Sequence, residues 1–217
     1  MTDKASTSII TKPLRCSYVN VFTPRLNDQS GLMEYGCEML IPKDDTETLD
    51  KIRAAMKAAM VQKFGEKKQF VVDTFLTGMK EFFKTGRTGF TDDDDLYFAV
   101  RDGDLEKTEG EDGKKVLLKT VRPEVAGHYL LRCKAKENNA PDVIDRERED
   151  VMDKTAFVSG DYGRLMLNCA AFETKGNRGC SFWLNGVQVW KKGEPLGSGK
   201  VSAKKAFNDD FEDASWD

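Results

Sequence analysis

Apolar and polar residues alternate in several segments of the chain, and this period of two predicts β-strands. In residues 32–41 the apolar side chains of Met33, Tyr35 and Cys37 share one parity, while Glu34 and Glu38 take the other. The first strand is expected to stop at Thr23-Pro24, and the stretch "TKGNRG" predicts a hairpin between the last two strands. The predicted strands are 13–22, 32–41, 127–137, 162–173 and 179–193, with a shorter one at 141–145.

A different period appears between the second and third strands. Apolar residues recur at spacings of three and four on an alanine-rich background, which predicts a helix over about 46–64. Asp44 to Thr46 supply capping oxygens and Gly65 follows the helix. Residues 66–125 show no sustained period, and we expect only a short helix in "DTFLTGMKEFF" and a short strand at 95–100.

These elements predict a mainly β fold with one inserted helix. Five long strands without an alternating βα rhythm favour a small, mainly antiparallel barrel. We expect a flexible leader at 1–12, a folded domain at 13–195, a linker at 196–207 and an acidic, disordered tail at 208–217.

Charge is distributed unevenly between the folded domain and the tail. The whole chain carries a net charge of -3, but "NDDFEDASWD" at 208–217 contains five acids and no base, which leaves +2 on residues 1–207. Such a separation of charge indicates an acidic interaction tail attached to a folded domain that prefers ligands of negative charge. No apolar run is long enough to cross a membrane and the N-terminus lacks a signal peptide, so we expect a cytoplasmic protein without a membrane partner.

Signals for an enzyme or a metal site are weak. The chain lacks a phosphate loop, a nucleophile elbow and an H-E-x-x-H motif, and its five cysteines contain no C-x-x-C pair. We therefore expect no cofactor and no bound metal. The aspartates Asp92–Asp95, Asp102 and Asp104 keep one alternative open, a divalent-metal nuclease or recombination enzyme.

A row of cations in segment 127–137 indicates nucleic-acid binding. Arg132, Lys134 and Lys136 share one parity, so in a strand they stand in a row about 7 Å apart, a pitch similar to that of the phosphates of an unpaired strand. On the last two strands Arg164, Phe172 and Trp183 take the outward parity, which places rings for base stacking beside cations for phosphates. The candidate nucleic-acid-binding residues are Arg132, Lys134, Lys136, Arg164, Phe172, Trp183, Lys191 and Tyr129.

Two further alternatives stay open at this point. The outward tryptophans also suit a contact between two copies of the chain, that is, a homodimer. A virion or assembly protein that binds other proteins would show the same strands without salt-sensitive retention on DNA.

The tail combines acids with two large aromatic residues. Its charge imitates phosphates, so a tethered tail is expected to compete with nucleic acid for a basic groove, and its rings are expected to serve as anchors for partner proteins. The residues concerned are Asp209, Asp210, Phe211, Glu212, Asp213, Trp216 and Asp217.

Several of these segments together resemble a known family. The stretches "LRCSYVNVFTPR", "YGCEMLIPKDD", "RDGD" and "CSFWLNGVQVWKKGEPL" look like those of phage single-stranded-DNA-binding proteins, similar in outline to the replication single-strand binders of podovirus-type phages. The resemblance covers most of residues 13–195. It implies a five-stranded oligonucleotide-binding (OB) barrel that coats unpaired DNA during phage replication and recombination in the infected host. It also implies an acidic tail that recruits phage or host replication and recombination proteins, with Trp216 near its end.

Overall fold

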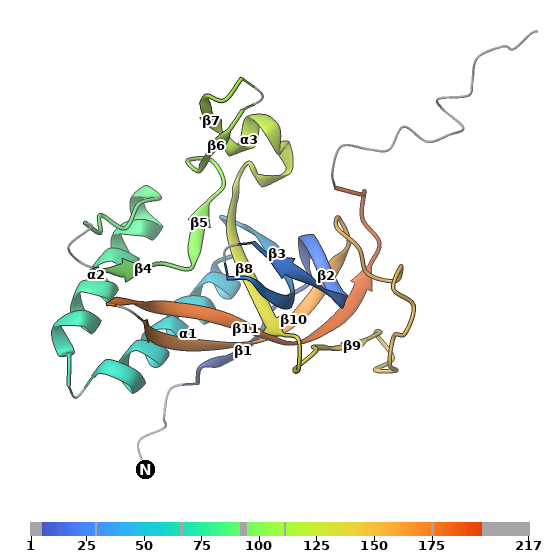
Figure 1. Cartoon of the computed structure of the whole chain (residues 1–217), viewed down its shortest axis with the longest axis horizontal. Coiled ribbons are helices and arrows are strands. Elements are labelled where there is room, and N and C mark those ends of the chain that lie inside the picture. Colours follow the sequence, from blue (N-terminus) through green and yellow to red (C-terminus); the bar gives the residue numbers. More distant parts are fainter. Residues whose placement is uncertain are drawn as a thin grey trace, which may run out of the picture.

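The structure, a computed structural model, is mainly β and describes residues 6–28, 30–65, 67–91, 95–110, 112–174 and 176–196 (Figure 1). This confirms the expected fold class. The strands are β1 (Ser8–Ile10), β2 (Leu14–Asn27), β3 (Leu32–Pro42), β4 (Leu96–Tyr97), β5 (Val100–Asp102), β6 (Lys107–Glu109), β7 (Lys115–Leu117), β8 (His128–Lys136), β9 (Asp142–Ile144), β10 (Tyr162–Thr174) and β11 (Asn177–Lys191). The helices are α1 (Thr46–Phe64), α2 (Gln69–Thr85), α3 (Leu118–Val121) and the 3-10 turn η2 (Pro123–Val125).

Five long strands pair in a ring, in the order β2, β3, β8, β11, β10 and back to β2. Four of the pairings are antiparallel, and only β8 and β11 run parallel. The β8–β11 and β10–β2 seams each consist of two residue pairs, so the ring is partly open. A partly open five-stranded ring is the arrangement expected of an OB fold.

The strands differ from the sequence prediction at both ends of β2. Residues 8–10, expected in the flexible leader, form β1 and pair with β10. β2 does not stop at Pro24 but continues to Asn27. Its pairing with β3 is irregular between Asn20 and Arg25, and such an irregularity accommodates a residue without a backbone N–H.

Two long helices follow β3, and the second, α2, contains the short helix expected in "DTFLTGMKEFF" but is longer. The predicted helix is present as α1, where the Asp45 side chain accepts a hydrogen bond from the N–H of Thr48 at 3.2 Å. Helix α2 buries Phe75 and Phe82 and ends at Gly86, whose φ of 79° is the left-handed conformation common at helix ends. Helix α1 lies along the extended β10–β11 hairpin, and α2 lies against α1 near the end of that hairpin (Figure 1). Among the described residues, no helix is long and apolar enough to cross a membrane.

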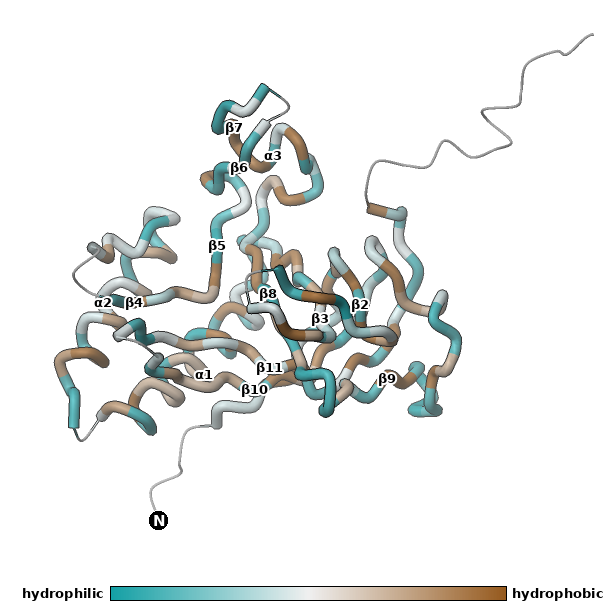
Figure 2. The backbone as a smooth tube through the Cα atoms, viewed as in Figure 1, coloured by the Kyte–Doolittle hydropathy of each residue, from teal (hydrophilic) through white to brown (hydrophobic). Residues whose placement is uncertain are grey.

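An arm formed by β6, β7 and α3 projects away from the ring (Figure 1). Its base rests on a small separate core of Leu40, Leu118, Val125 and Leu130. The main core fills the ring and the space beneath α1 and α2, and hydrophilic residues mark the turn after β8 (Figure 2).

Candidate nucleic-acid interface

The outward face of β8 carries the predicted row of cations. Arg132 and Lys136 are exposed and Lys134 is half-buried, whereas Leu131, Cys133 and Ala135 between them are fully buried. The alternation arises because successive side chains of a strand point to opposite faces. The strand therefore presents three cations on one side and core residues on the other.

Two buried carboxylates on the neighbouring strand β3 hold Lys134 and two arginines from other elements in place. Lys134 donates a hydrogen bond from Nζ to Oε1 of Glu34 at 2.8 Å, and Glu34 is only 7% exposed. Burial alone raises the pKa of Glu34, but the hydrogen bonds that Lys134 and Asn27 donate outweigh it, so the pKa lies below its usual value. Glu34 is thus an anion that fixes the Lys134 ammonium.

Glu38 performs the same task for two arginines from other elements. Arg101 of β5 forms an ion pair with Oε2 of Glu38, and Nη1 of Arg122 lies 3.0 Å from Oε1. Sequence reasoning assigned Glu34 and Glu38 only to the parity opposite the apolar residues, yet both are buried. Their burial depends on ion pairs with cations from distant segments of the chain. A local sequence pattern does not reveal such pairs. Arg101 also pairs with Glu106 at 3.5 Å and Arg122 with Glu124 at 2.9 Å. The positive charge that the face offers to a ligand is therefore carried mainly by the exposed Arg132 and Lys136.

Two aromatic side chains, Trp183 and Tyr97, lie beside the cations, and a third, Phe172, packs against Tyr97. Trp183 of β11 lies beside β8, with Nζ of Lys134 and Nζ of Lys136 at 6.0 and 5.7 Å from its ring centroid. The ring of Phe172 lies 6.0 Å from that of Tyr97, which is 47% exposed. Tyr97 is not among the candidate residues named from the sequence, because β4 contains two residues and shows no period.

Gly179 brings Tyr97 to this position. β4 pairs with β11 at Gly179, and a Cβ added there would lie 2.3 Å from the carbonyl oxygen of Tyr97. Only glycine permits so close an approach of two backbones. The resulting groove has a volume of about 640 Å³ and is lined, among others, by Leu26, Tyr97, Arg101, Arg132, Lys134 and Ser181.

Of the predicted site residues, Arg132 and Lys134 line this groove. Lys136 and Trp183 lie next to it through Lys134, and Phe172 through Tyr97, whereas the three others lie elsewhere. Arg164 approaches the ring of Trp190 at 6.0 Å, and Nζ of Lys191 lies 4.5 Å from the ring centroid of Tyr162. Tyr129 is 7% exposed and packs against Phe82 and Phe83, with centroids 5.5 and 5.3 Å apart. Its side chain belongs to the core and contributes no ring to the outward face.

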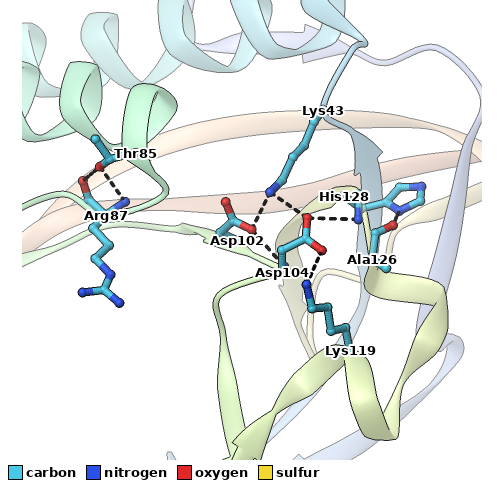
Figure 3. Close-up of polar contacts among 9 residues, drawn as sticks. Lys43, Thr85, Arg87, Asp102, Asp104, Lys119, Ala126 and His128 are labelled. Carbon is cyan, nitrogen blue, oxygen red and sulfur yellow. Dashed lines mark hydrogen bonds and ion pairs between the residues drawn. The ribbon is translucent and has the colours of Figure 1, made fainter.

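The carboxylates of Asp102 and Asp104 are engaged by lysines (Figure 3). Nζ of Lys43 lies 2.6 Å from Asp102 and 2.9 Å from Asp104, and Lys119 reaches Asp104 at 3.2 Å. The hydrogen bond from Lys43, followed by those from Lys119 and Gly127, lowers the pKa of Asp104 to about 2. These contacts connect β5, α3 and the segment after β3. The four side chains therefore form an ion cluster with a structural role.

The described residues contain no group of three or more His, Cys, Asp or Glu side chains that is arranged to hold a metal ion. Residues 92–94 of the predicted alternative metal site lie outside the described residues, as does the whole tail at 208–217. The five cysteines are buried and free.

Comparison with known proteins places the chain in a family. Its sequence matches the family described as "Enterobacter phage Enc34, ssDNA-binding protein" over residues 7–216. The solved structure of the single-stranded DNA-binding protein from bacteriophage Enc34 in complex with ssDNA has a TM-score of 0.60 at 19% identity, covering 91% of this chain and 96% of that one. The structure of the same protein without DNA gives 0.57 at 19% identity, covering 95% and 96%.

A sequence relative comes from another phage. "Putative protein p50" of Acyrthosiphon pisum secondary endosymbiont phage 1 is 23% identical over 198 residues, which is 90% of each chain. The family match extends over nearly the whole sequence and confirms the resemblance noted in the sequence. The chain therefore belongs to the Enc34 family of phage ssDNA-binding proteins.

Proposed function

We propose that the chain is a non-enzymatic protein that coats single-stranded DNA during phage replication and recombination, in the cytoplasm of the infected host. One observation carries the proposal: the ammonium groups of Lys134 and Lys136 lie about the ring of Trp183, at 6.0 and 5.7 Å from its centroid. A nucleotide offers a phosphate and a flat base, so cations beside an outward ring match both of its parts. Membership in a family described by an ssDNA-binding protein supports the same function.

In this proposal the strand runs through the groove with its phosphates along β8 and its bases toward the rings. Arg132 and Lys136 are exposed and contact phosphates as mobile cations, while Lys134 is fixed by Glu34. Trp183, Phe172 and Tyr97 stack on bases, and since every base has a face to stack, little sequence preference results. The buried carboxylates of Glu34 and Glu38 position Lys134, Arg101 and Arg122 before the strand arrives, which lowers the entropy lost on binding.

The test is a titration of the protein with poly(dT) at several salt concentrations, followed by tryptophan fluorescence. We expect the logarithm of the binding constant to fall linearly with the logarithm of the salt concentration, with a slope of about -0.7 per phosphate contacted. In the double variant Arg132→Ala/Lys136→Ala the slope should become shallower by about 1.4. These two residues are chosen because their removal leaves neither buried glutamate without its cation.

The matched control removes two exposed lysines of α2, Lys80 and Lys84. It changes the net charge by the same amount at a site beside the hairpin, outside the groove, and should leave the slope unaltered. Equal slopes for both double variants would show that the β8 row makes no phosphate contact.

Sedimentation of the free protein in the same buffers measures whether a homodimer forms. A dimer that dissociates on DNA binding would support a contact between two copies through the outward tryptophans.

The acidic tail at 208–217 is proposed to gate the groove and to recruit replication and recombination proteins. Its five acids compete with phosphates, and Phe211 and Trp216 compete with bases or anchor a partner. A chain that ends at residue 207 should bind dT oligonucleotides more tightly than the full chain, most visibly at low salt. Weaker binding by the truncated chain would refute the gating role.

A further inference from the structure

A second basic and aromatic pocket lies on the same side of β11 as the groove. It has a volume of about 480 Å³, and Arg146, Arg148, Arg164, Asp142, Met166 and Trp190 line it together with neighbouring residues of β9, β10 and β11. Three guanidinium groups face one carboxylate, so the pocket is positive. The other acids of the loop 145–150 do not line it.

A β-bulge in β11 places this pocket on the face that carries Trp183. Leu167 pairs with Leu184 and Met166 with Gly186, so β11 contributes three residues where β10 contributes two. In a regular strand Trp183 and Gln188 would point to opposite faces, because their separation is odd. The extra residue brings Ser181, Trp183 and Gln188 to one side of the sheet. The groove and the pocket therefore share one continuous outer face, and Ser181 and Gln188 are separated by roughly 20 Å along the strand.

The side chains of the pocket are held in a fixed arrangement. Arg164 donates hydrogen bonds to Oε1 of Gln188 at 3.0 Å and to the carbonyl oxygen of Thr11 at 3.4 Å. The guanidinium carbon of Arg146 lies 4.7 Å from the ring centroid of Trp190. Guanidinium groups that flank an indole combine phosphate donors with a flat stacking surface, the same pair of features that the groove offers.

We propose that this pocket is a second nucleotide subsite, which takes the continuation of the DNA strand after it has passed Trp183. Phosphates contact Arg146, Arg148 and Arg164, and a base packs between Trp190 and the apolar wall at Met166. The inference rests on the proposed function, because the strand reaches the pocket from the groove. It assigns a role to Arg164, which the structure separates from the β8 row, and it divides the binding site into two parts along β11.

The division predicts that the contribution of the pocket depends on oligonucleotide length. One OB fold covers about 4 to 16 nucleotides, so an oligomer of about six (dT6) fills the groove alone and one of about twenty (dT20) fills both parts. The test is fluorescence anisotropy of labelled dT6 and dT20 with the full chain and with Arg146→Ala/Arg148→Ala. We expect the variant to bind dT20 about tenfold more weakly and dT6 within about twofold of the unchanged protein. The Lys80→Ala/Lys84→Ala variant is the charge-matched control and should change neither affinity.

A second readout places the strand at Trp190 itself. In the variant Trp183→Phe/Trp216→Phe the only remaining tryptophan is Trp190. Its fluorescence should be quenched by dT20 and little affected by dT6. Equal losses of affinity at both lengths, or none at either, would overturn the second subsite. Quenching of Trp190 by a synthetic peptide of residues 208–217 that carries Trp216→Phe, but not by dT20, would identify the pocket as a site for the acidic tail and overturn the proposal too. If the unchanged protein bound neither oligomer, the proposed function itself would fail, which is a separate result.

Discussion

Lys134 and Glu34 form an ion pair at the centre of the proposed interface, with Nζ 2.8 Å from Oε1. The carboxylate is 8% exposed and the lysine side chain 32%, so the anion lies beneath the cation. A phosphate that approaches Lys134 therefore meets an ammonium whose charge is already partly balanced from below. The pair orders the cation and at the same time limits the attraction that it exerts.

Replacing Glu34 by glutamine should strengthen DNA binding. Glu34→Gln retains a hydrogen-bond acceptor for Lys134 and removes the buried negative charge, so we expect dT20 to bind roughly 3- to 10-fold more tightly at low salt, with convergence at high salt. The free energy of unfolding should fall by about 1–3 kcal/mol, because the ammonium loses a charged partner. Anisotropy titrations and urea unfolding measure the two effects. Glu81→Gln, an exposed site on α2, removes the same charge and should change neither; weaker binding by Glu34→Gln would mean that the ordering of Lys134 outweighs its partial neutralisation.

The ring of Trp183 is expected to contribute stacking rather than charge. Trp183→Ala should cost about 1–3 kcal/mol of binding free energy for dT20, whereas Trp183→Phe should retain most of the affinity. Since neither change removes a cation, the dependence of the binding constant on salt should keep its slope. A changed slope in Trp183→Ala would indicate that the indole acts by positioning Lys134 and Lys136 and not by stacking.

Gly179 is expected to determine the shape of the groove. In Gly179→Ala the new Cβ would lie 2.3 Å from the carbonyl oxygen of Tyr97, so β4 must move and Tyr97 leaves Phe172. We expect a loss of stability of about 1–3 kcal/mol and weaker binding of dT6. Gly186→Ala is the stability control, because its Cβ would meet its nearest neighbour, the carbonyl oxygen of Asp142, at 3.4 Å. Equal thermal midpoints for the two variants would show that β4 adapts without strain.

Local patterns in the sequence were sufficient for the elements that depend on local interactions. The helix at Thr46–Phe64 follows from its period and its cap, and the outward row of β8 follows from strict alternation. The strand order of the ring needs more, because the pairings β8–β11 and β10–β2 involve only two residue pairs each. From the sequence, only the family resemblance implied an OB barrel, and the order of its strands was not predicted.

The features that the sequence did not reveal are those that join distant segments. Glu38 can be buried because Arg101 of β5 and Arg122, the residue before η2, pair with its carboxylate. Neither contact produces a periodic pattern in the sequence. The pocket at Trp190 depends on an extra residue in β11, which shifts the parity of everything beyond it. A strict period of two assigns Trp183 and Gln188 to opposite faces, so the shared face was not visible from the sequence.

The ion cluster at Asp104 predicts a loss of stability in acid. The pKa of Asp104 is about 2 in the folded protein, against an ordinary value of 3.8, and the hydrogen bond from Lys43 is the largest cause of this decrease. A depressed pKa contributes stability above pH 3.8, and this contribution disappears as the pH falls toward 2. Between pH 5 and pH 3 the contribution of Asp104 to the free energy of unfolding should fall by about 1 kcal/mol. This is an upper bound, because the carboxylate is partly exposed to solvent.

Comparison with Asp104→Asn isolates this contribution from those of the other carboxylates. The variant has no titrating group at this position, so the difference in unfolding free energy between it and the unchanged protein should shrink by about 1 kcal/mol from pH 5 to pH 3. Urea unfolding at both pH values measures it, and Asp73→Asn, at an exposed position of α2, serves as the control. A difference that stays constant would show that Lys43 holds Asp102 alone. In that case the arm would be fastened to the ring by its apolar base at Leu118 and Val125, and the lysines would add little to its attachment.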